Sequence, residues 1–403
     1  MPNLHSLLTL EYGEALTAEL RSGHGYPVFG SNGEVGRHYK FLVPESGIII
    51  GRKGSVGKVT WSEEPFWPID TTYWVSCAPE DRRWLYWVLS WLPLARLDSS
   101  TGVPGLNRND VYALSVDQPS IIERQKIVQI LDTLDTAIHE TEAIIAKLKA
   151  VKQGLLHDLL TRGIDANGKL RPPQAEAPHL YKGSPLGWIP KEWELAQLSS
   201  RIARLDAGIS VNSEDRPHGA GEIGVLKTSA LSRGEFRPDQ NKTVVATEVA
   251  WVRESVASDS ILVSRMNTPE LVGESCYVTD PWPNLFLPDR VWQLKKGEPD
   301  SVDMKWLSLV FLTSRYRSYV QIHATGTSGS MKNLPKARLL AMPIAFPNLD
   351  EQGDIASRIW AIDEKIVSEV ASMEKLKAQK FGLMDDLLTG RVRVTPLLEA
   401  AGT

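Results

Sequence analysis

PSIIERQKIVQILDTLDTAIHETEAIIAKLKAVKQGLLHDLLT, residues 119–161, recurs at residues 347–389 as PNLDEQGDIASRIWAIDEKIVSEVASMEKLKAQKFGLMDDLLT. The offset is 228 residues, and about 17 of the 43 aligned positions are identical. An internal repeat at a fixed offset is the sequence signature of one structural unit used more than once. We therefore expect a globular piece followed by one long element, and then the same arrangement again.

Apolar residues recur in steps of four and three through both copies, which predicts two long helices with a heptad seam. Each copy opens with a capping-box-like signal just after a proline, Ser120 with Glu123 and Asn348 with Glu351. We expect the two seams to pack on each other as a coiled-coil pair. Pseudo-twofold symmetry favours an antiparallel pair, although the reach of the linker also permits a parallel one. The predicted packing residues are Ile127, Leu131, Leu134, Ile138, Ile145, Leu148, Leu155, Ile355, Ile359, Ile362, Ile366, Met373, Leu376 and Leu383.

The rest of the chain reads as two strand-rich domains of the α+β class, each with some helix, which we expect at 82–97 in the first domain. Short alternating runs such as 47–61 and 71–77 are separated by Gly, Pro and Asn, which is typical of strands and turns. Twelve of the 13 tryptophans lie outside the two helix copies. We place the domains at 1–118 and 188–346, the helices at 119–162 and 347–390, a Pro/Gly-rich linker at 163–187 and a tail at 391–403.

Composition bounds the class of protein. The 403 residues are 42% hydrophobic and 23% charged, as in an ordinary folded protein, and no window is apolar enough for a membrane span. The first ten residues lack the pattern of a signal peptide, and two distant cysteines, Cys77 and Cys276, fit a reducing cytoplasm without a structural zinc site. The net charge of −4 offers no basic footprint, so DNA binding would need local clusters or a partner.

Motifs that would indicate catalysis are incomplete, and we expect no catalytic residue, metal or cofactor. GRKGSVGKV at 51–59 lacks phosphate-loop spacing and the Ser or Thr that would hold magnesium. GAGEIG at 219–224 has no convincing strand before it or helix after it. Asp289 with Asp303 and Lys305 has a permissive nuclease-like spacing, which keeps a nuclease as one alternative.

Polar and basic residues on glycine-rich turns are the remaining candidates. Arg and Asn side chains can make paired hydrogen bonds with base edges, while lysines and backbone amides can hold phosphate. The alternative is that these are ordinary solvated hairpin turns. The candidates are Ser31, Asn32, Arg37, His38, Arg52, Lys53, Ser55, Lys58, Asn107 and Arg108 in the first domain, and Lys227, Arg265, Asn267, Thr268, Ser328, Ser330, Lys332 and Asn333 in the second.

Several motifs together resemble the DNA-specificity subunits of type I restriction–modification systems. The resemblance covers nearly the whole length, and the motifs are specific only in combination. They are VFGSNGEVGRH (28–38), IIIGRKGSVGKV (48–59), FWPIDTTYWV (66–75), PSIIERQKIVQILDTLD (119–135), LLTRGID (159–165), LGWIPKEWE (186–194), SRMNTPELVG (264–273), LPDRVWQL (287–294) and TGTSGSMKNL (325–334).

The resemblance implies two target-recognition domains, each reading one half of a bipartite site in double-stranded DNA. It also implies two antiparallel helices that act as a spacer and dock two methyltransferase subunits, with motor-nuclease subunits joining that core. It implies no catalytic site in this chain. Because the two domains differ in sequence while the helices repeat, we expect an asymmetric target with an unspecified gap.

One departure and two further alternatives accompany this interpretation. The lead-in at 188–193, typical of each recognition domain, has no equivalent before the first domain, so the sequence leaves the first strand of that domain undefined. One alternative is a coiled-coil scaffold that carries two protein- or carbohydrate-binding modules. The other is a specificity subunit of a different class of restriction system.

Overall fold

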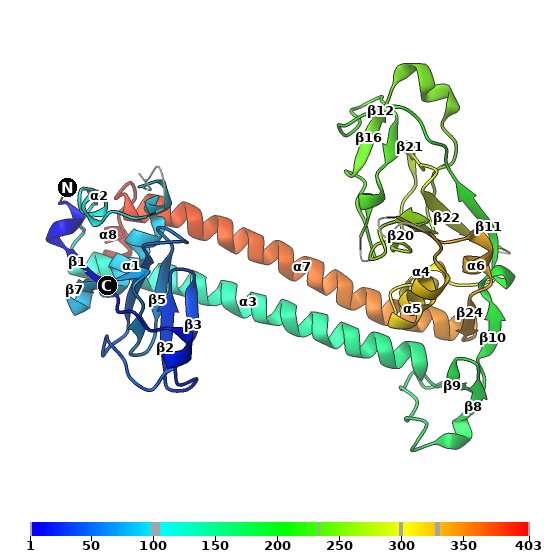
Figure 1. Ribbon diagram of the computed structural model, residues 1–403, viewed down its shortest axis with the longest axis horizontal. Coiled ribbons are helices and arrows are strands. Elements are labelled where there is room, and N and C mark those ends of the chain that lie inside the picture. Colours follow the sequence, from blue (N-terminus) through cyan, green and yellow to red (C-terminus); the bar gives the residue numbers. More distant parts are fainter. Residues whose placement is uncertain (1, 98–104, 233, 298–300, 327–330, 402–403) are drawn as a thin grey trace. The chain divides into compact units, whose positions relative to one another are not determined.

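The structure is a computed structural model that describes residues 2–97, 105–232, 234–297, 301–326 and 331–401 (Figure 1). The chain divides into two compact units. The first unit combines Met1–Ile145 with Ser368–Thr403, and the second comprises Ala146–Val367. Each unit therefore contains one globular domain together with part of both long helices. No described helix has both the length and the apolar content that crossing a lipid bilayer would require.

The two predicted long helices are confirmed as α3 (Ile121–Thr161) and α7 (Leu349–Leu388). Their N-termini use the capping signals of the sequence. The Ser120 amide donates to Glu123 Oε2 over 3.1 Å, and the Glu351 amide donates to Asn348 Oδ1 over 2.9 Å. These bonds satisfy backbone groups that a helix end leaves without an intrahelical partner.

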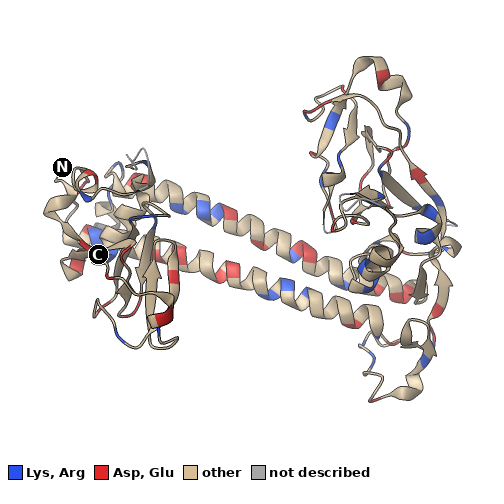
Figure 2. Cartoon of the chain, viewed as in Figure 1, with Lys and Arg blue, Asp and Glu red and all other residues tan. Residues whose placement is uncertain are grey.

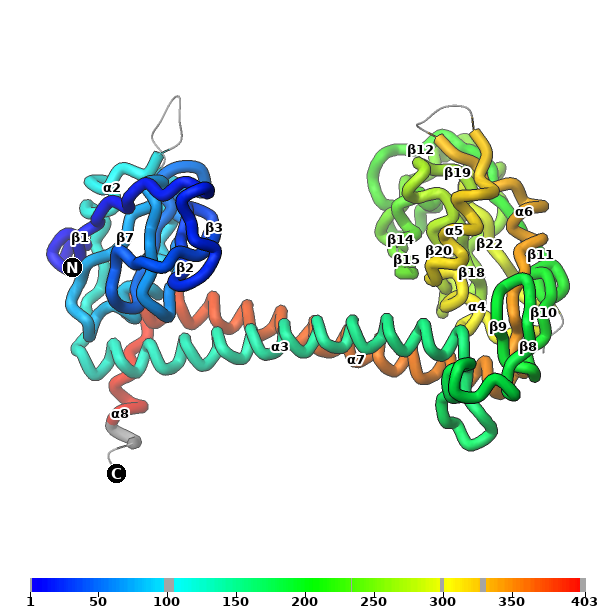
Figure 3. The backbone as a smooth tube through the Cα atoms, turned by 60° about the horizontal axis from the view of Figure 1, so that its bottom comes forward, coloured from blue at the N-terminus to red at the C-terminus, as the bar shows by residue number. Residues whose placement is uncertain are grey.

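Within each unit the two helices run antiparallel, because the start of one packs against the end of the other (Figures 1 and 3). The first unit joins Ile127 and Leu131 of α3 to Leu387 of α7 in one buried cluster. In the second unit Leu159 of α3 packs with Ile355 of α7. All 14 predicted seam positions are buried or partly buried.

Lysines that interrupt the apolar seam form matching ion pairs across it. Lys152 Nζ lies 2.6 Å from Asp363 Oδ1 in the second unit, and Lys380 pairs with Asp135 in the first. The partners are related by the repeat offset of 228 residues, so one pair is the repeat counterpart of the other. The interruptions therefore preserve the pseudo-twofold symmetry of the helix pair.

Each domain contains a four-stranded antiparallel sheet with the same strand order. In the first unit the order is β1-β7-β4-β5, and in the second it is β11-β22-β18-β20. The two sheets are thus topologically equivalent despite their different sequences. The bounds are β1 Leu8–Tyr12, β4 Gly47–Gly51, β5 Val59–Ser62, β7 Thr72–Cys77, β11 Ile202–Ala207, β18 Ser260–Ser264, β20 Ser275–Val278 and β22 Val291–Lys296.

A second sheet repeats as well, with additions in the second unit. Order β3-β2-β6 in the first unit corresponds to β16-β13-β21 in the second, where β12 and β17 extend the edges. In both sheets the central strand has one antiparallel and one parallel neighbour. The bounds are β2 Tyr26–Gly30, β3 Gly33–His38, β6 Trp67–Pro68, β12 Ser213–Glu214, β13 Gly224–Leu226, β16 Asn241–Val244, β17 Ser255–Val256 and β21 Trp282–Phe286.

Shorter elements complete the two units. Helices are α1 Arg82–Trp91, α2 Arg108–Tyr112, α4 Met304–Val310, α5 Ser314–His323, α6 Lys336–Leu340 and α8 Thr395–Ala401. Two-stranded pairs are β8 Tyr181–Ser184 with β9 Gly187–Pro190, β10 Glu194–Gln197 with β24 Pro343–Phe346, β14 Leu231–Ser232 with β15 Glu235–Phe236, and β19 Met266–Asn267 with β23 Lys332–Asn333.

Each domain is fixed to a long helix through an aspartate that starts a short helix. Asp81, before α1, forms an ion pair with Arg124 of α3. Asp303, before α4, occupies the corresponding place and its amide donates to Gln352 Oε1 over 2.9 Å. Arg124 and Gln352 are themselves related by the repeat offset. The domain–helix junction is therefore duplicated along with the sheets.

The first strand that the sequence left undefined is β1, which pairs with β7 from Leu8 to Tyr12. Asn3 forms a bridge with Ser115, and the short turn Leu4–Ser6 precedes β1. In the second unit β10 pairs with β24 and the turn Leu198–Ser200 precedes β11. Residues 3–6 of the first domain thus correspond to residues 197–200 of the second, whereas the lead-in at 188–193 precedes them in the second unit.

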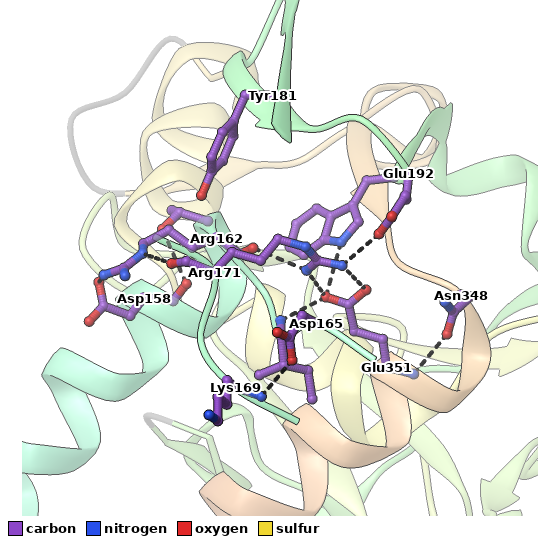
Figure 4. Close-up of polar contacts among 12 residues, drawn as sticks. Asp158, Arg162, Asp165, Lys169, Arg171, Tyr181, Glu192, Asn348 and Glu351 are labelled. Atoms are coloured by element: carbon purple, nitrogen blue, oxygen red, sulfur yellow. Dashed lines mark hydrogen bonds and ion pairs between the residues drawn. The ribbon is translucent and has the colours of Figure 1, made fainter. Parts of the chain in front are cut away.

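The predicted polar linker at 163–187 is an ordered segment that covers the junction of the two helices (Figure 4). Arg171 is only 6% exposed and donates to both carboxylate oxygens of Glu351, over 2.5 and 3.1 Å. The same carboxylate accepts from the Ile164 amide at 2.9 Å and from Trp193 Nε1 at 3.2 Å. Burial alone would lower the pKa of Arg171, but the hydrogen bonds and negative charges of Glu351 and Glu192 together outweigh burial and raise that pKa.

We expect Glu351→Ala to lower the free energy of unfolding by about 3–5 kcal/mol, because it leaves the buried Arg171 guanidinium with only the exposed Glu192 carboxylate as a counter-charge. Urea unfolding of the full chain measures the loss, and hydrogen exchange over residues 163–193 locates it. The matched control is Glu364→Ala, which removes an exposed carboxylate from the same helix. Equal stability of the two variants would contradict this assignment.

Candidate nucleic-acid interface

Three segments of the first domain carry most of its predicted binding residues and lie close together. The β2–β3 turn contacts the loop after β4, since Lys58 Nζ donates to the Asn32 carbonyl and Oδ1 over 2.8 and 2.9 Å. The Lys53 amide donates to the Thr71 carbonyl just before β7. Ser31 and Ser55 border the same loop, because a side chain added at Gly51 would clash with both of their carbonyl oxygens.

Arg52 and Arg108 converge on one aromatic side chain in this region. The Arg52 guanidinium lies 5.1 Å from the ring centre of Tyr12 and 5.8 Å from that of Tyr73. Arg108 lies 5.5 Å from the same Tyr12 ring, which is 50% exposed. Such cation–π contacts orient a guanidinium without neutralising it. Asn107 starts α2, and its side chain accepts from the Asn109 amide over 2.9 Å.

Hydrogen bonds to backbone carbonyls hold the side chains of Arg52 and Tyr73 in place. Arg52 Nη2 donates to the Asp70 carbonyl over 2.6 Å. The Tyr73 hydroxyl donates to the Leu106 carbonyl over 3.1 Å. Burial, together with its bond to Tyr12, raises the pKa of Tyr73 to about 12, so the phenol stays neutral around neutral pH.

Arg265 has a closely similar environment in the second domain. Its guanidinium lies 5.7 Å from the ring centre of Trp292, and Nη1 donates to the Asp289 carbonyl over 3.4 Å. Its Nε donates to Asn333 Oδ1 over 3.3 Å. Asn267 accepts from the Thr268 amide, which shapes the loop after β18, and Lys332 Nζ donates to the Gly326 carbonyl over 3.1 Å.

Backbone hydrogen bonds establish that Arg52 and Arg265 are equivalent positions of the duplicated fold. The Leu106 amide donates to the Arg52 carbonyl, and the Leu334 amide donates to the Arg265 carbonyl. The Arg52 amide donates to the carbonyl of Thr71, just before β7, and the Arg265 amide donates to the carbonyl of Arg290, just before β22. In the first domain the amide of Gly57, five residues after Arg52, donates to the carbonyl of Gly51, the residue before the arginine. In the second domain the amide of Gly273, eight residues after Arg265, donates to the carbonyl of Ser264.

The charge of these arginines is not compensated locally. Within the part of the chain that the structure describes, Arg52, Arg108 and Arg265 form no ion pair. Elsewhere Lys and Arg alternate with Asp and Glu, most clearly along both long helices (Figure 2). A chain with a net charge of −4 therefore still presents local positive charge at equivalent places in its two domains.

Three predicted residues do not join this arrangement, and two more cannot be placed in it. His38 is 7% exposed and its ring packs against Tyr39 and Trp67, so burial removes it from the candidate interface. Arg37 forms ion pairs with Glu34 and Glu64, and Lys227 forms one with Asp215 over 2.9 Å. Carboxylates of the protein therefore already compensate both positive charges. Ser328 and Ser330 lie outside the described residues.

Sequence reasoning missed the groups that orient the arginines. Tyr12, Tyr73 and Trp292 supply the rings, and Asp70 and Asp289 supply backbone carbonyls rather than carboxylates. Alignment of PIDTTYW (68–74) with LPDRVWQ (287–293) would have revealed the shared aspartate and the aromatic residue three positions later. That alignment becomes evident only after the long helices reveal the repeat.

The nuclease alternative fails on geometry. Asp289 precedes the start of β22 and accepts from Ser210 Oγ, whereas Asp303 follows the end of that strand and caps α4. Lys305 lies over the ring of Trp360. The two aspartates thus flank opposite ends of β22, a six-residue strand about 20 Å long, which is not an arrangement in which two carboxylates share a metal ion. Among the described residues there is no group of three His, Cys, Asp or Glu side chains that could hold one.

Comparison with known proteins gives one consistent family. Residues 3–150 match the model of the "Type I restriction modification DNA specificity domain". The type I restriction enzyme EcoEI specificity subunit of Escherichia coli is 29% identical over 172 residues, which cover 42% of this chain and 29% of that protein. The MjaVIII specificity subunit of Methanocaldococcus jannaschii is 23% identical over 300 residues, covering 74% of this chain and 66% of that protein.

The fold is shared with a solved structure. A type I restriction–modification S subunit from M. genitalium superposes with a TM-score of 0.64 at 16% identity, covering 96% of this chain and 95% of that one. The chain matches less than two thirds of the length of each sequence relative named above. Residues 3–150 thus match the specificity-domain model, and the chain is similar in sequence to type I specificity subunits.

The loop that presents Arg52 depends on Gly57, which has φ +74° and would place a side chain against the backbone of Leu94 and Ala95. We expect Gly57→Ala to lower the free energy of unfolding by more than the roughly 1–2 kcal/mol that a left-handed residue costs. Gly23→Ala is the control, because Gly23 has φ +76° with open space around it. Urea unfolding compares the two, and equal losses would show that the contact of Gly57 with 94–95 is unimportant.

Proposed function

We propose that this chain is a non-catalytic specificity subunit that recognises a bipartite DNA sequence and recruits methyltransferase and restriction subunits to it. The observation that carries the proposal is the same oriented, uncompensated arginine at equivalent positions of two domains, Arg52 and Arg265. Kinship with type I specificity subunits supports it. Such a subunit works where the DNA is, in the bacterial or archaeal cytoplasm.

The proposed target is asymmetric. The two domains share strand order but differ in the side chains around the arginine, as in Tyr73 against Trp292. Base readout depends on the side chains that reach the groove, so different surfaces recognise different half-sites. We therefore expect two unlike half-sites separated by a gap whose sequence is not read.

The paired helices are the proposed docking surface for two methyltransferase subunits, with motor-nuclease subunits joining that core. Several apolar side chains of these helices face solvent in the isolated chain. Ile122 is 62% exposed, Val367 69% and Phe381 73%. Exposed apolar groups on helices that already bury their own seam favour contact with a further protein.

Methylome sequencing tests the proposal directly. A host expressing this chain with its cognate methyltransferase subunit is compared with a host that expresses the methyltransferase alone. We expect new methylation confined to one gapped, bipartite motif. Co-purification without any new motif would contradict recognition by these domains, and failure of the two proteins to associate would favour the scaffold alternative.

Helix length is expected to set the permitted gap. Removing the repeat-related heptads 141–147 and 369–375 together keeps both seams and both Lys–Asp pairs. It shortens the pair by about 10 Å, or about three base pairs. We expect the methylated motif to keep both half-sites with a shorter gap.

The control for this deletion is removal of 141–147 alone, which misaligns the two helices. We expect that variant to lose assembly with the methyltransferase or to lose methylation. An unchanged gap in the double deletion, with the complex intact, would refute the role of the helices as a spacer.

A further inference from the structure

We infer that Arg52 and Arg265 contact the DNA phosphate backbone in the two half-sites, and that Arg108 with Tyr12 reads bases in the first half-site only. This inference rests on the proposed function. It assigns the shared arginines to the part of the target that is the same in both halves. It assigns discrimination to groups that the two domains do not share.

Arg52 and Arg265 are held in the same way in their two domains. Each follows the second strand of its four-stranded sheet, lies over an aromatic residue of the adjacent strand, and donates to the carbonyl of an aspartate. The adjacent residues are Tyr73 of β7 and Trp292 of β22. A side chain held alike in two domains cannot by itself distinguish two unlike base sequences, whereas phosphate groups are the same in both.

A second feature is the state of the guanidinium groups. A guanidinium has five N–H donors, and the protein engages one from Arg52 and two from Arg265. Neither side chain has a carboxylate partner among the described residues. Phosphate supplies both the missing charge and acceptors in the planar geometry that arginine prefers.

A third feature is a difference at the edge of the sheet. Tyr12 pairs with Tyr73, and the corresponding partner of Trp292 is Ala207. Arg108 lies over Tyr12, whereas its equivalent in the second domain, Lys336, donates to the backbone carbonyl of Leu205 over 2.9 Å. Arg108 therefore faces outward in the first domain, whereas Lys336 at the same place in the second domain is held by a hydrogen bond within the protein.

The chemistry of this unshared group suits base recognition. Arg108 is exposed, and it extends from the start of α2 beside the half-exposed ring of Tyr12. An arginine fixed by an aromatic ring can donate two parallel hydrogen bonds to the major-groove edge of guanine. No equivalent of this pair exists among the described residues of the second domain, so its effect is confined to one half-site.

The test uses the complex of the full chain with its methyltransferase subunit. The methylome of the wild-type complex defines the motif, and a duplex carrying that motif is the binding probe between about 50 and 300 mM salt. Variants are Arg52→Ala, Arg265→Ala and Arg108→Ala. Arg37→Ala is the control, because its charge is already paired with Glu34 and Glu64 in the same domain.

For Arg52→Ala and Arg265→Ala we expect about 10- to 100-fold weaker binding to cognate and single-mismatch duplexes alike. The motif should stay unchanged, and the slope of log K against log salt should fall by about 1 in each variant. Arg52→Lys should restore the slope, since lysine also serves phosphate but cannot replace a paired base contact. Arg37→Ala should behave as wild type.

For Arg108→Ala we expect discrimination at one base pair of the first half-site to fall by roughly 5- to 150-fold, with the second half-site unchanged. The inference is overturned if Arg52→Ala or Arg265→Ala relaxes the motif, or if Arg108→Ala leaves it intact. A wild-type complex that binds no duplex and methylates no motif overturns the proposed function as well. Circular dichroism of each variant separates these results from loss of folding.

Discussion

Antiparallel pairing of the two helix copies is the constraint on which the rest of the molecule depends. Each globular domain completes its core with residues from both helices, such as Ile127 with Leu387 in the first unit and Leu159 with Ile355 in the second. Two ion pairs, Lys152–Asp363 and Lys380–Asp135, also fix the register of the helix pair, because both form together in only one antiparallel alignment. A slip by one heptad would separate Lys152 from Asp363 and Lys380 from Asp135.

The duplicated helices carry a duplicated fold whose surfaces have diverged. The four-stranded sheets, the aspartate at the domain–helix junction and the oriented arginine all recur. Side chains around the arginine have changed, as Tyr12 against Ala207 shows. This division between constant framework and variable surface is what a protein needs if two domains dock alike on DNA yet recognise different sequences.

Sequence reasoning succeeded where the signal is periodic and failed where it depends on distant neighbours. The heptads gave both helices to within two residues of their ends. The predicted helix at 82–97 instead stops at Trp91, because Leu92 precedes Pro93 and is forced into an extended conformation. The polar segment at 163–187 looked like a linker because its burial depends on Glu351, which lies far away in the sequence.

The sequence by itself determined the repeat, the two helices, the α+β domains and the family resemblance, because periodicity and motif combinations can be read directly along the chain. Only the tertiary structure decided which of the predicted basic residues are buried or paired with carboxylates. It brought Tyr12, Arg52, Tyr73 and Arg108 together from four separate segments, buried His38 and paired Arg37 with carboxylates. The physical reason is that availability of a charge is set by the groups packed around it, and strand pairing chooses those groups from across the whole domain.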